Sequence, residues 1–439
     1  MPRLALKPDS SFFRKIAIGV VGTRGICIDL GRYEHEVVEL ERGSLDTKLW
    51  KEVKRKRVRI PDLICKRCGL RVESRAKSKP DLSMSHSLAD EARSWDLGMV
   101  DSDLVAFPVC RATNEQYWSA GRLGPEASYW HERNWVHWQL TGPITYCRVG
   151  AFRSTPHTQM RAKGVTEGSE TIVSWKAVFS PRSGRIEAIN GRRLSIRRLA
   201  DGHLWTCTIP EALDIAVSEG EAVEAGQLIA SAVHAERRTE FSCPGSLPAN
   251  HIDNLLQSRE RTQRFTGVKL ARLRGDKTVQ GKVRELANDQ EEDVYIRLEG
   301  ASYLASISGK SARELFSAYL ASSDPQIQLE AVIALGETAN GQAVELLSEI
   351  LDQPIRPYFL RSAAAWCLSR IGGEHAAGRL VRAFSDVDRN IREEALEGLV
   401  AIGGAHFQYF CPAFVRPMKK SHLGLLRHYD NSFYPTKSF

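Results

Sequence analysis

The clearest pattern of apolar and polar positions lies between residues 313 and 405. Three segments there begin with an apolar residue, Ile327, Leu360 or Ile391, and the fourth, seventh and eighth residues after each are again small or apolar. This spacing places those side chains on one face of a helix. The three starts are 33 and 31 residues apart, and glycine follows each run. The pattern predicts a repeat of paired short helices, which is an α-solenoid.

The repeat resembles HEAT repeats of the short type found in phycobilisome lyases, with Arg361 and Arg392 just after the first apolar position of their units. The resemblance implies a scaffold over 313–405 that binds another protein. It also implies that the aromatic and basic tail, 406–439, caps the last repeat. Nothing else in the chain indicates an enzyme that acts on a pigment, so we do not expect lyase activity.

A different pattern, of short strands interrupted by proline and glycine, covers residues 173–235. Valine and glycine alternate at every third position from Val217 to Gly226. This stretch resembles barrel-sandwich hybrid domains, an all-β family that includes biotinyl and lipoyl carriers. The carriers present a modified lysine, but residues 194–199 contain none, so we predict a docking module. Its arginines either contact nucleic acid or form an ordinary solvated hairpin face; they are Arg192, Arg193, Arg197 and Arg198.

The first 150 residues mix apolar runs of several lengths. Residues 14–31 are rich in β-branched residues and glycine and predict strands, whereas 33–52 predicts a helix with exposed glutamates. A hairpin is predicted over 59–77 and a buried strand over 103–110. The glycines near the N-terminus lack the Gly-Lys-Ser/Thr of a phosphate-binding loop. The sequence thus predicts an α/β domain over 1–150 in a multidomain α+β protein.

The predicted hairpin carries candidate chemistry. Asp62 ends its first apolar run, and Glu73, Arg75 and Lys77 alternate along the second. Side chains two apart share one face of a strand. Two carboxylates can bind a hard divalent cation, and a nearby cation can stabilise charge on a phosphate oxygen. This is the equipment for metal-assisted phosphodiester cleavage. The alternative is a surface hairpin with routine cross-strand ion pairs.

Pro61-Asp62 and Glu73 are similar to the motif of the PD-(D/E)xK nuclease superfamily. The resemblance implies a restriction-endonuclease-like domain in which Asp62 and Glu73 hold Mg²⁺, helped by Glu39 or Glu41. The family has lysine two residues after the second acid, where this chain has Arg75. Arg75 can act electrostatically but cannot be a base. Either it acts alone, or Lys77 reaches the site, or the site binds nucleic acid without cleaving it.

Cys65 and Cys68 flank the turn of the same hairpin, in the order Cys-Lys-Arg-Cys-Gly. Two thiolates on one tight turn are typical of a zinc knuckle, which needs four ligands. No second Cys-x-x-Cys is present. Cys110, Cys147 or His86 could complete a Zn²⁺ site, and two free thiols are the alternative.

Charge is concentrated around this hairpin. The chain has a net charge of +8, and residues 51–79 alone hold twelve Lys or Arg against three Asp or Glu. A focused positive field attracts nucleic acid, although a solvated basic run would look the same. Further along, tryptophans and histidines either stack on bases or pack in a core; they are Trp118, Trp130, Trp135, Trp138, His131 and His137.

Nine scattered cysteines do not form a secreted disulfide framework. No signal-peptide core and no apolar run of membrane-spanning length are present, so we expect a cytoplasmic protein without a membrane partner. The leading hypothesis is a Mg²⁺-dependent nuclease that acts on nucleic acid, with DNA favoured, and that suits bacterial defence against foreign DNA. The alternatives are a non-catalytic adaptor, which binds nucleic acid and recruits a protein through the HEAT repeats, and a zinc-organised structural subunit.

Overall fold

The structure is a computed structural model that forms two compact units. Among the described residues, a β-rich unit comprises those up to residue 270, and a helical unit comprises those from residue 271 to residue 402. Each unit is described by itself. The described residues are 10–41, 58–87, 90–113, 138–157, 159–162, 170–237, 241–307 and 309–402.

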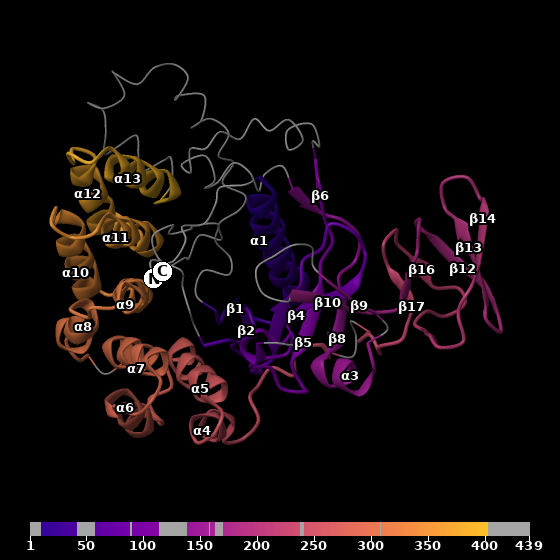
Figure 1. Ribbon diagram of the computed structural model, residues 1–439, viewed down its shortest axis with the longest axis horizontal. Coiled ribbons are helices and arrows are strands. Elements are labelled where there is room, and N and C mark those ends of the chain that lie inside the picture. The colour runs from indigo at the N-terminus through magenta and orange to yellow at the C-terminus, as the bar shows by residue number, and fades with distance from the viewer. Residues whose placement is uncertain are drawn as a thin grey trace, which may run out of the picture. The chain divides into compact units, whose positions relative to one another are not determined.

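The β-rich unit is organised around a mixed five-stranded sheet with the order β1-β2-β3-β5-β8 (Figure 1). Neighbouring strands are antiparallel except β3 and β5, which are parallel. Alternate side chains of each strand face the two sides of the sheet, and both sides bury an apolar core: Leu104 and Ala106 of β5 lie in one, and Val105 and Phe107 lie in the other. The strands are β1 (Val37–Glu39), β2 (Leu63–Cys65), β3 (Arg71–Ser74), β5 (Leu104–Phe107) and β8 (Thr145–Arg148).

Residues 14–31, predicted as strands, form helix α1 (Ser10–Gly31) instead. Ile26 and Leu30, one helical turn apart, are fully buried in the core on one face of the sheet. A Cβ added at Gly22 would lie 2.6 Å from the Cβ of Ala76, so this glycine lets the helix approach closely. Residues that favoured strands locally are therefore packing residues of a helix, because tertiary contacts outweigh intrinsic propensity.

The helix predicted over 33–52 is also wrong for its described part, 33–41. After α1 the chain turns at Glu34, which has a φ of 64°, and then enters β1, where Val37 pairs with Cys65. β1 is an edge strand of the sheet. An edge strand tolerates exposed charged side chains as readily as a helix surface does, which is why the glutamates misled the prediction. Residues 42–52 lie outside the described part of the chain.

Smaller elements complete the first part of this unit. Trp138, on β7, is buried with Ala17, Ile18 and Cys110, so it serves as a core residue. The other tryptophans and the two histidines of that segment lie outside the described residues. The elements are β4 (Leu82–Ser87), β9 (Gln159–Ala162) and β10 (Glu170–Trp175) in one sheet, β6 (Cys110–Ala112) and β7 (Trp138–Leu140) in another, η1 (Glu91–Arg93) and α3 (Val149–Ser154).

Residues 177–231 form two small sheets with the orders β11-β17-β15 and β14-β13-β12-β16. Their buried side chains, among them Ile186, Leu194 and Ile229, form one core. Gly220 and Gly226 have positive φ at the turns that flank β16. The strands are β11 (Ala177–Phe179), β12 (Gly184–Asn190), β13 (Arg193–Arg198), β14 (Leu204–Thr208), β15 (Asp214–Ile215), β16 (Ala222–Val223) and β17 (Leu228–Ser231).

The arginines of these sheets make contacts within the protein. Arg197 pairs with Glu187 at 2.5 Å, and the Nε of Arg198 donates to Asp201 at 2.6 Å. Arg192 donates to the backbone oxygens of Leu213 and Glu211. Contact of these arginines with nucleic acid stays a prediction, since the side chains of Arg197 and Arg198 remain partly exposed beside their partners. Two short helices follow, α4 (His251–Leu256) and α5 (Arg261–Arg274).

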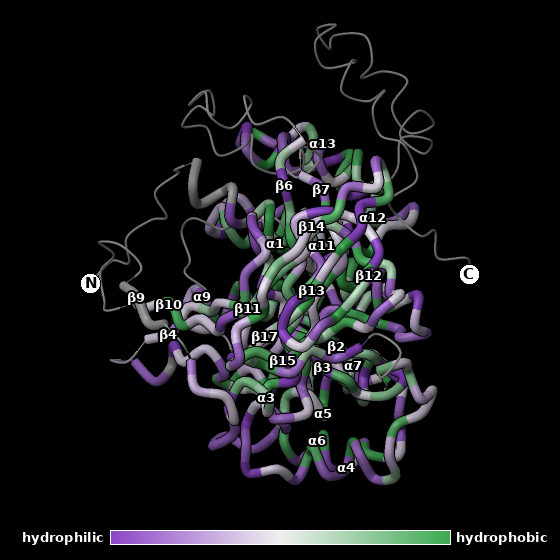
Figure 2. Tube along the Cα trace, turned by 90° about the vertical axis from the view of Figure 1, so that its right-hand side faces the viewer, coloured by the Kyte–Doolittle hydropathy of each residue, from purple (hydrophilic) through white to green (hydrophobic). Residues whose placement is uncertain are grey.

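The helical unit confirms the predicted repeat. Its helices lie in two layers, with α6, α8, α10 and α12 in one and α7, α9, α11 and α13 in the other (Figure 1). Apolar and polar stretches alternate along the chain trace (Figure 2), as they must where each helix buries one face. The helices are α6 (Gln280–Asn288), α7 (Val294–Ile307), α8 (Ala312–Leu320), α9 (Pro325–Thr338), α10 (Gly341–Asp352), α11 (Tyr358–Ile371), α12 (Gly373–Ala383) and α13 (Arg389–Ile402).

The arginines that follow the first apolar position of two repeats are structural. Arg361, only 3% exposed, donates its Nε to the backbone oxygen of Leu351 at 2.8 Å and pairs with Asp386. Arg392 donates to the backbone oxygen of Asp386 at 2.7 Å. Both arginines thus fasten the loop before α13. The tail 406–439, predicted as a cap, lies outside the described residues, and among the described helices none is long and apolar enough to cross a membrane.

Candidate functional site

The hairpin of β2 and β3 brings Asp62 and Glu73 to opposite positions. Leu63 pairs with Val72 in antiparallel register, and continuation of this register by one residue sets Asp62 opposite Glu73. The backbone N–H of Ser74 donates to the Oδ2 of Asp62 at 2.8 Å, which fixes the aspartate against β3. Directly opposed positions in a sheet have Cβ atoms about 5 Å apart, and like charges there are unfavourable. The two carboxylates therefore lie together at an energetic cost.

The pKa values of the two carboxyl groups reflect this cost. Burial and the nearby charges of Glu73 and Glu41 raise the pKa of Asp62 well above its usual range, although Ser74 N–H and Arg75 oppose the rise. Burial likewise raises the pKa of Glu73, which is 9% exposed, against the lowering effect of Arg75 and Arg59. Such a concentration of negative charge would be relieved by a bound cation.

Glu41 is brought to the pair by β1 and the residues that follow it. The backbone N–H groups of Leu40 and Glu41 both donate to the carbonyl oxygen of Asp62, at 2.8 and 3.2 Å. Of the two glutamates considered from the sequence, Glu41 is the one whose charge raises the pKa of both carboxyl groups. Glu41 thus follows β1, Asp62 precedes β2 and Glu73 lies on β3, so three neighbouring segments of the sheet carry acids, although their oxygens are not among the close groups of three or more ligand atoms found in the described residues.

Arg75 and Lys77 occupy different surroundings. The Nη2 of Arg75 lies 3.0 Å from the Oε1 of Glu73 and donates to the backbone oxygen of Trp95 at 3.1 Å. Its Nε is buried and has no hydrogen-bond partner among the described residues. Lys77 instead directs its Nζ to the backbone and side-chain oxygens of Ser83. Arg75 therefore lies beside the carboxylate of Glu73, whereas Lys77 is bound to Ser83.

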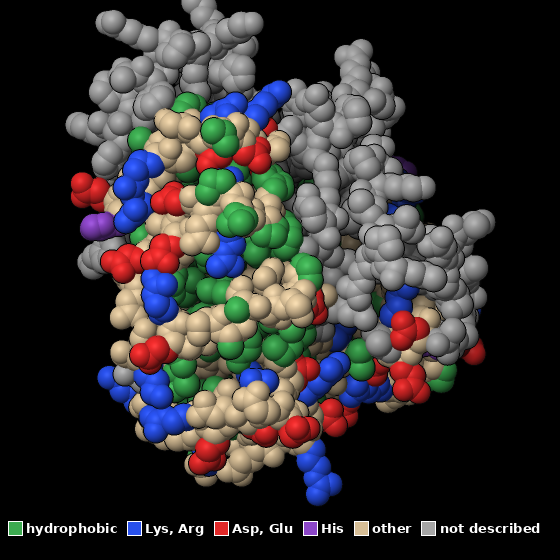
Figure 3. Space-filling view, turned by 60° about the vertical axis from the view of Figure 1, so that its left-hand side comes forward, with side chains coloured by type: hydrophobic (Ala, Val, Ile, Leu, Met, Phe, Trp, Pro, Cys, Tyr) green, Lys and Arg blue, Asp and Glu red, His purple; other side chains and the backbone are tan. Residues whose placement is uncertain are grey.

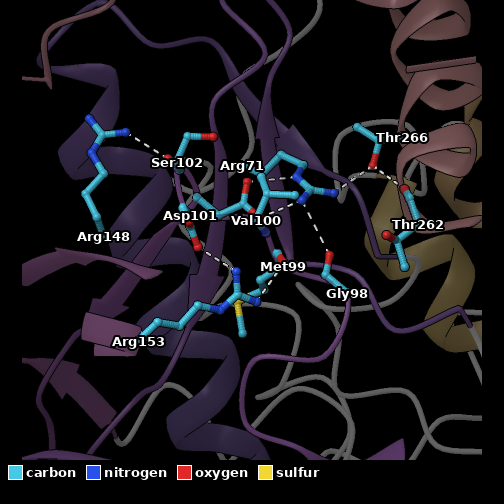
Figure 4. Close-up of polar contacts among 11 residues, drawn as sticks. Arg71, Gly98, Met99, Val100, Asp101, Ser102, Arg148, Arg153, Thr262 and Thr266 are labelled. Atoms are coloured by element: carbon cyan, nitrogen blue, oxygen red, sulfur yellow. Dashed lines mark hydrogen bonds and ion pairs between the residues drawn. The ribbon is translucent and has the colours of Figure 1, made fainter. Parts of the chain in front are cut away.

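A buried ion pair anchors β3 beside this site. Arg71 directs its Nε and Nη2 to the two carboxylate oxygens of Asp103, at 2.9 and 2.5 Å. The Nη1 of Arg71 donates to the Oγ1 of Thr266 at 3.1 Å (Figure 4). Both partners of the pair are almost fully buried. A two-point arginine–carboxylate pair restricts the direction of both side chains. It holds β3, which carries Glu73, against the segment that leads into β5.

A second cluster lies at the turn of the hairpin. Cys65 and Cys68 from the turn meet His35, which follows α1, and Cys243, and the four ligand atoms all lie within 4.8 Å of one another. The Sγ atoms of Cys65 and Cys243 are 3.9 Å apart, and the Sγ of Cys68 is 3.6 Å from the Nδ1 of His35. Three sulfurs and one imidazole nitrogen are a donor set that could bind Zn²⁺.

The hydrogen bonds of the cluster favour one thiolate. The Cys68 thiol lowers the pKa of Cys65 to about 3, against the opposing effect of burial, with further contributions from His35 and from the backbone N–H groups of Cys68 and Arg67. The bond to Cys65 correspondingly raises the pKa of Cys68. Burial opposes protonation of His35, but bonds to Cys65 and to the carbonyl of Phe241 outweigh it and raise the pKa.

Two of these four residues, His35 and Cys243, were not predicted from the sequence. The candidates named there were Cys110, Cys147 and His86, but Cys110 and Cys147 are buried in separate apolar clusters and His86 lies on β4. His35 and Cys243 stand 33 and 178 residues from their partners in the cluster. No motif with a fixed spacing along the chain identifies metal ligands that are so far apart in sequence. The only available signal was that Cys243 is a cysteine in a Pro- and Gly-rich loop.

Comparisons with known proteins concern the helical unit. No curated protein sequence matches the chain. Among solved structures, human deoxyhypusine hydroxylase is 16% identical, with 35% of this chain and 72% of that chain covered and a TM-score of 0.24. A designed armadillo repeat protein in complex with the peptide (KR)4 is 15% identical, with 35% and 80% covered and the same TM-score. The family of HEAT repeats matches residues 312–400. Together with the stacked helix pairs, this match identifies the C-terminal part of the chain as HEAT repeats.

Proposed function

We propose that the protein is a metal-dependent nuclease, with DNA as the favoured substrate. One observation carries the proposal. Asp62 and Glu73 occupy opposed positions of a hairpin, and burial raises the pKa of both; the charge of Glu41 adds to the rise at each, and the charge of Glu73 adds to it at Asp62. A protein that only needed a stable sheet would gain from replacing one of these acids. Carboxylate oxygens are the ligands that Mg²⁺ prefers, so the donor set fits the cofactor.

In this mechanism Asp62 and Glu73 would hold Mg²⁺, which supplies a bound water of lowered pKa and shields the scissile phosphate. The guanidinium of Arg75, beside Glu73, would stabilise charge that develops on a phosphate oxygen. Since arginine keeps its proton at any physiological pH, Arg75 is not the general base. The Arg71–Asp103 pair keeps β3 in place, and with it the direction of Glu73.

The other parts of the chain suit recruitment. The HEAT repeats would bind a protein partner, and the two small sheets over 177–231, which resemble a barrel-sandwich hybrid domain, would serve as a docking module. In support, two apolar side chains are almost fully exposed on the loops before α11 and α13: Ile355 at 93% and Val387 at 90%. Figure 3 shows basic, acidic and apolar side chains interspersed on one face of the helices, a mixture better suited to a protein than to a polyanion. Defence against foreign DNA is the setting that this combination suits.

The test compares purified wild-type protein with Asp62→Asn and Glu73→Gln on plasmid, single-stranded DNA and RNA. We expect cleavage that requires Mg²⁺ or Mn²⁺, stops in EDTA, returns when Mg²⁺ alone is restored, and is lost in both variants. Asp81→Asn, a change in an acid outside the site, is the matched control and should cut normally. Cleavage that continues unchanged in both site variants would contradict the assignment.

A second function, a nucleic-acid-binding adaptor without cleavage, is favoured by one specific contact. The cation nearest Glu73 is the fixed guanidinium of Arg75, which already neutralises part of the charge that would attract a metal. If neutralisation by Arg75 prevents a metal from binding, the protein binds DNA equally well with and without divalent cations and cuts none of the substrates. Binding that is unchanged in Asp62→Asn, in the absence of any cutting by wild type, supports the adaptor.

A further inference from the structure

The Cys/His cluster at the hairpin turn has the dimensions of an assembled metal centre. Zn²⁺ binds sulfur at about 2.3 Å and imidazole nitrogen at about 2.0–2.1 Å in a tetrahedron. These bond lengths place two sulfurs about 3.8 Å apart and a sulfur and a nitrogen about 3.6 Å apart. The observed separations are 3.9 Å between the sulfurs of Cys65 and Cys243, and 3.6 Å between the Sγ of Cys68 and the Nδ1 of His35. A disulfide would require about 2.05 Å between sulfurs.

The imidazole of His35 is oriented as a metal ligand requires. Its Nε2 lies 2.5 Å from the carbonyl oxygen of Phe241, an oxygen that can only accept. The Nε2 therefore carries the hydrogen, which leaves a lone pair on Nδ1, the atom that faces Cys68. A backbone carbonyl on the far nitrogen is the usual partner that fixes the tautomer of a metal-bound histidine. Phe241 and Cys243 belong to one short segment, which thus provides both a ligand and this support.

The backbone holds the two cysteines of the turn close together. The N–H of Gly69 donates to the carbonyl oxygen of Cys65 at 2.8 Å, and the N–H of Cys65 donates to the carbonyl oxygen of Leu70 at 2.8 Å. Gly69 has a φ of 78°, and a Cβ there would lie 2.7 Å from the Nε2 of His251, so glycine is needed for this turn.

From these observations we propose that His35, Cys65, Cys68 and Cys243 hold one structural Zn²⁺. All four positions of a tetrahedron are filled by the protein, which leaves none for a substrate and distinguishes the site from a catalytic zinc centre. The ion joins three segments: the turn after α1, the hairpin turn, and the segment of Cys243, whose N–H also donates to the carbonyl of Tyr33 at 3.0 Å. The proposal does not depend on nuclease activity.

The role follows from the positions of the ligands in the chain. The contacts of Cys68 with His35 and of Cys65 with Cys243 bridge 33 and 178 residues. A cross-link that closes long loops removes conformational freedom mainly from the unfolded chain. The hairpin turn would be fastened at one end, while Asp62 and Glu73 lie at the other end of the same two strands. We therefore expect the ion to stabilise the β-rich unit rather than to take part in chemistry.

The first test is the metal content of the purified full-length chain, measured by elemental analysis. We expect about one zinc per chain in wild type and a loss of most of it in Cys243→Ser and His35→Ala. Cys110→Ser and Cys147→Ser change buried cysteines outside the cluster and should retain the full content. Wild-type protein without zinc, or zinc that persists in both ligand variants, overturns the proposal.

The second test uses only wild-type protein, so that misfolding of a variant cannot decide the outcome. Thiols that react with a chromogenic disulfide reagent are counted before and after removal of metal by a chelator, and again after Zn²⁺ is restored. Release of zinc should expose three further reactive thiols and lower the unfolding temperature, and Zn²⁺ should reverse both changes. An unchanged thiol count, or a disulfide between Cys65 and Cys243 in peptide mapping, overturns the proposal.

Discussion

The Nη2 of Arg75 lies 3.0 Å from the Oε1 of Glu73, on the same face of the chain that leads out of β3. In the nuclease family that the hairpin resembles, this position carries a lysine. An arginine can form two parallel hydrogen bonds with a phosphate or a carboxylate, whereas a lysine is a single, more mobile charge. The contact therefore bears on the choice between an enzyme and a binding protein.

Replacement of Arg75 by alanine tests its catalytic contribution. If Arg75 stabilises charge on the scissile phosphate, Arg75→Ala should lower the cleavage rate at saturating DNA about 100-fold, the usual loss for one such donor. The measurement is single-turnover cleavage with Mg²⁺. Arg111→Ala removes an exposed arginine of β6 and should leave the rate unchanged, so an equal loss in both variants would argue against a specific role.

The raised pKa of Asp62 predicts an unusual dependence of stability on pH. The folded protein keeps the proton at pH values where the unfolded chain has lost it, so stability falls as pH rises above about 4 toward the folded pKa. Asp62→Asn cannot ionise and should be more stable than wild type at pH 7, with the difference vanishing at pH 4. Thermal unfolding at both pH values measures this, and each kcal/mol corresponds to roughly 2–4 °C.

Mg²⁺ supplies the control for that experiment. A cation between the carboxylates should raise the unfolding temperature of wild type at pH 7 and have little effect on Asp62→Asn, because binding to the folded state alone stabilises it. Equal shifts in the two proteins would place the cation elsewhere.

Alanine substitutions at two glycines of α1 should change the stability of the protein in opposite directions. A Cβ at Gly22 would lie 2.6 Å from Ala76 and 2.8 Å from Pro108, so Gly22→Ala should destabilise the β-rich unit by about 1–3 kcal/mol through overpacking. At Gly19 a Cβ would meet nothing within 4 Å, and Gly19→Ala should stabilise the helix by about 0.5–1 kcal/mol. Denaturant unfolding of both variants checks the signs, and two changes of the same sign would refute the proposed helix packing.

Two arginines of the HEAT repeats, one buried and one exposed, allow the effect of burial on an ion pair to be compared. Arg361→Ala leaves Asp386 and the carbonyl of Leu351 without their buried partner and should cost about 3 kcal/mol. Arg389 forms an exposed pair with Glu393, so Arg389→Ala should cost less than about 0.5 kcal/mol. The helical unit can be followed by circular dichroism during thermal unfolding. A similar loss for both arginines would mean that burial does not determine their contribution.

The sequence by itself determined the helical repeats and the hairpin. Ile327, Leu360 and Ile391 begin runs with a helical period, and such a pattern needs only local information and a neighbouring repeat. The apolar runs on both sides of Cys65 and Cys68 likewise specified two strands and their turn. In these segments the residues that pack together are also close in the chain, so the pattern carries the structure.

Only the tertiary structure decided the rest. Ile26 and Leu30 lie in a helix, not a strand, because the sheet offers a surface that glycines such as Gly22 can approach. His35 and Cys243 join Cys65 and Cys68 through the folding of segments far apart in sequence. The opposition of Asp62 and Glu73 follows from strand register. Contacts between distant segments depend on the whole chain's packing, which no local period or spacing encodes.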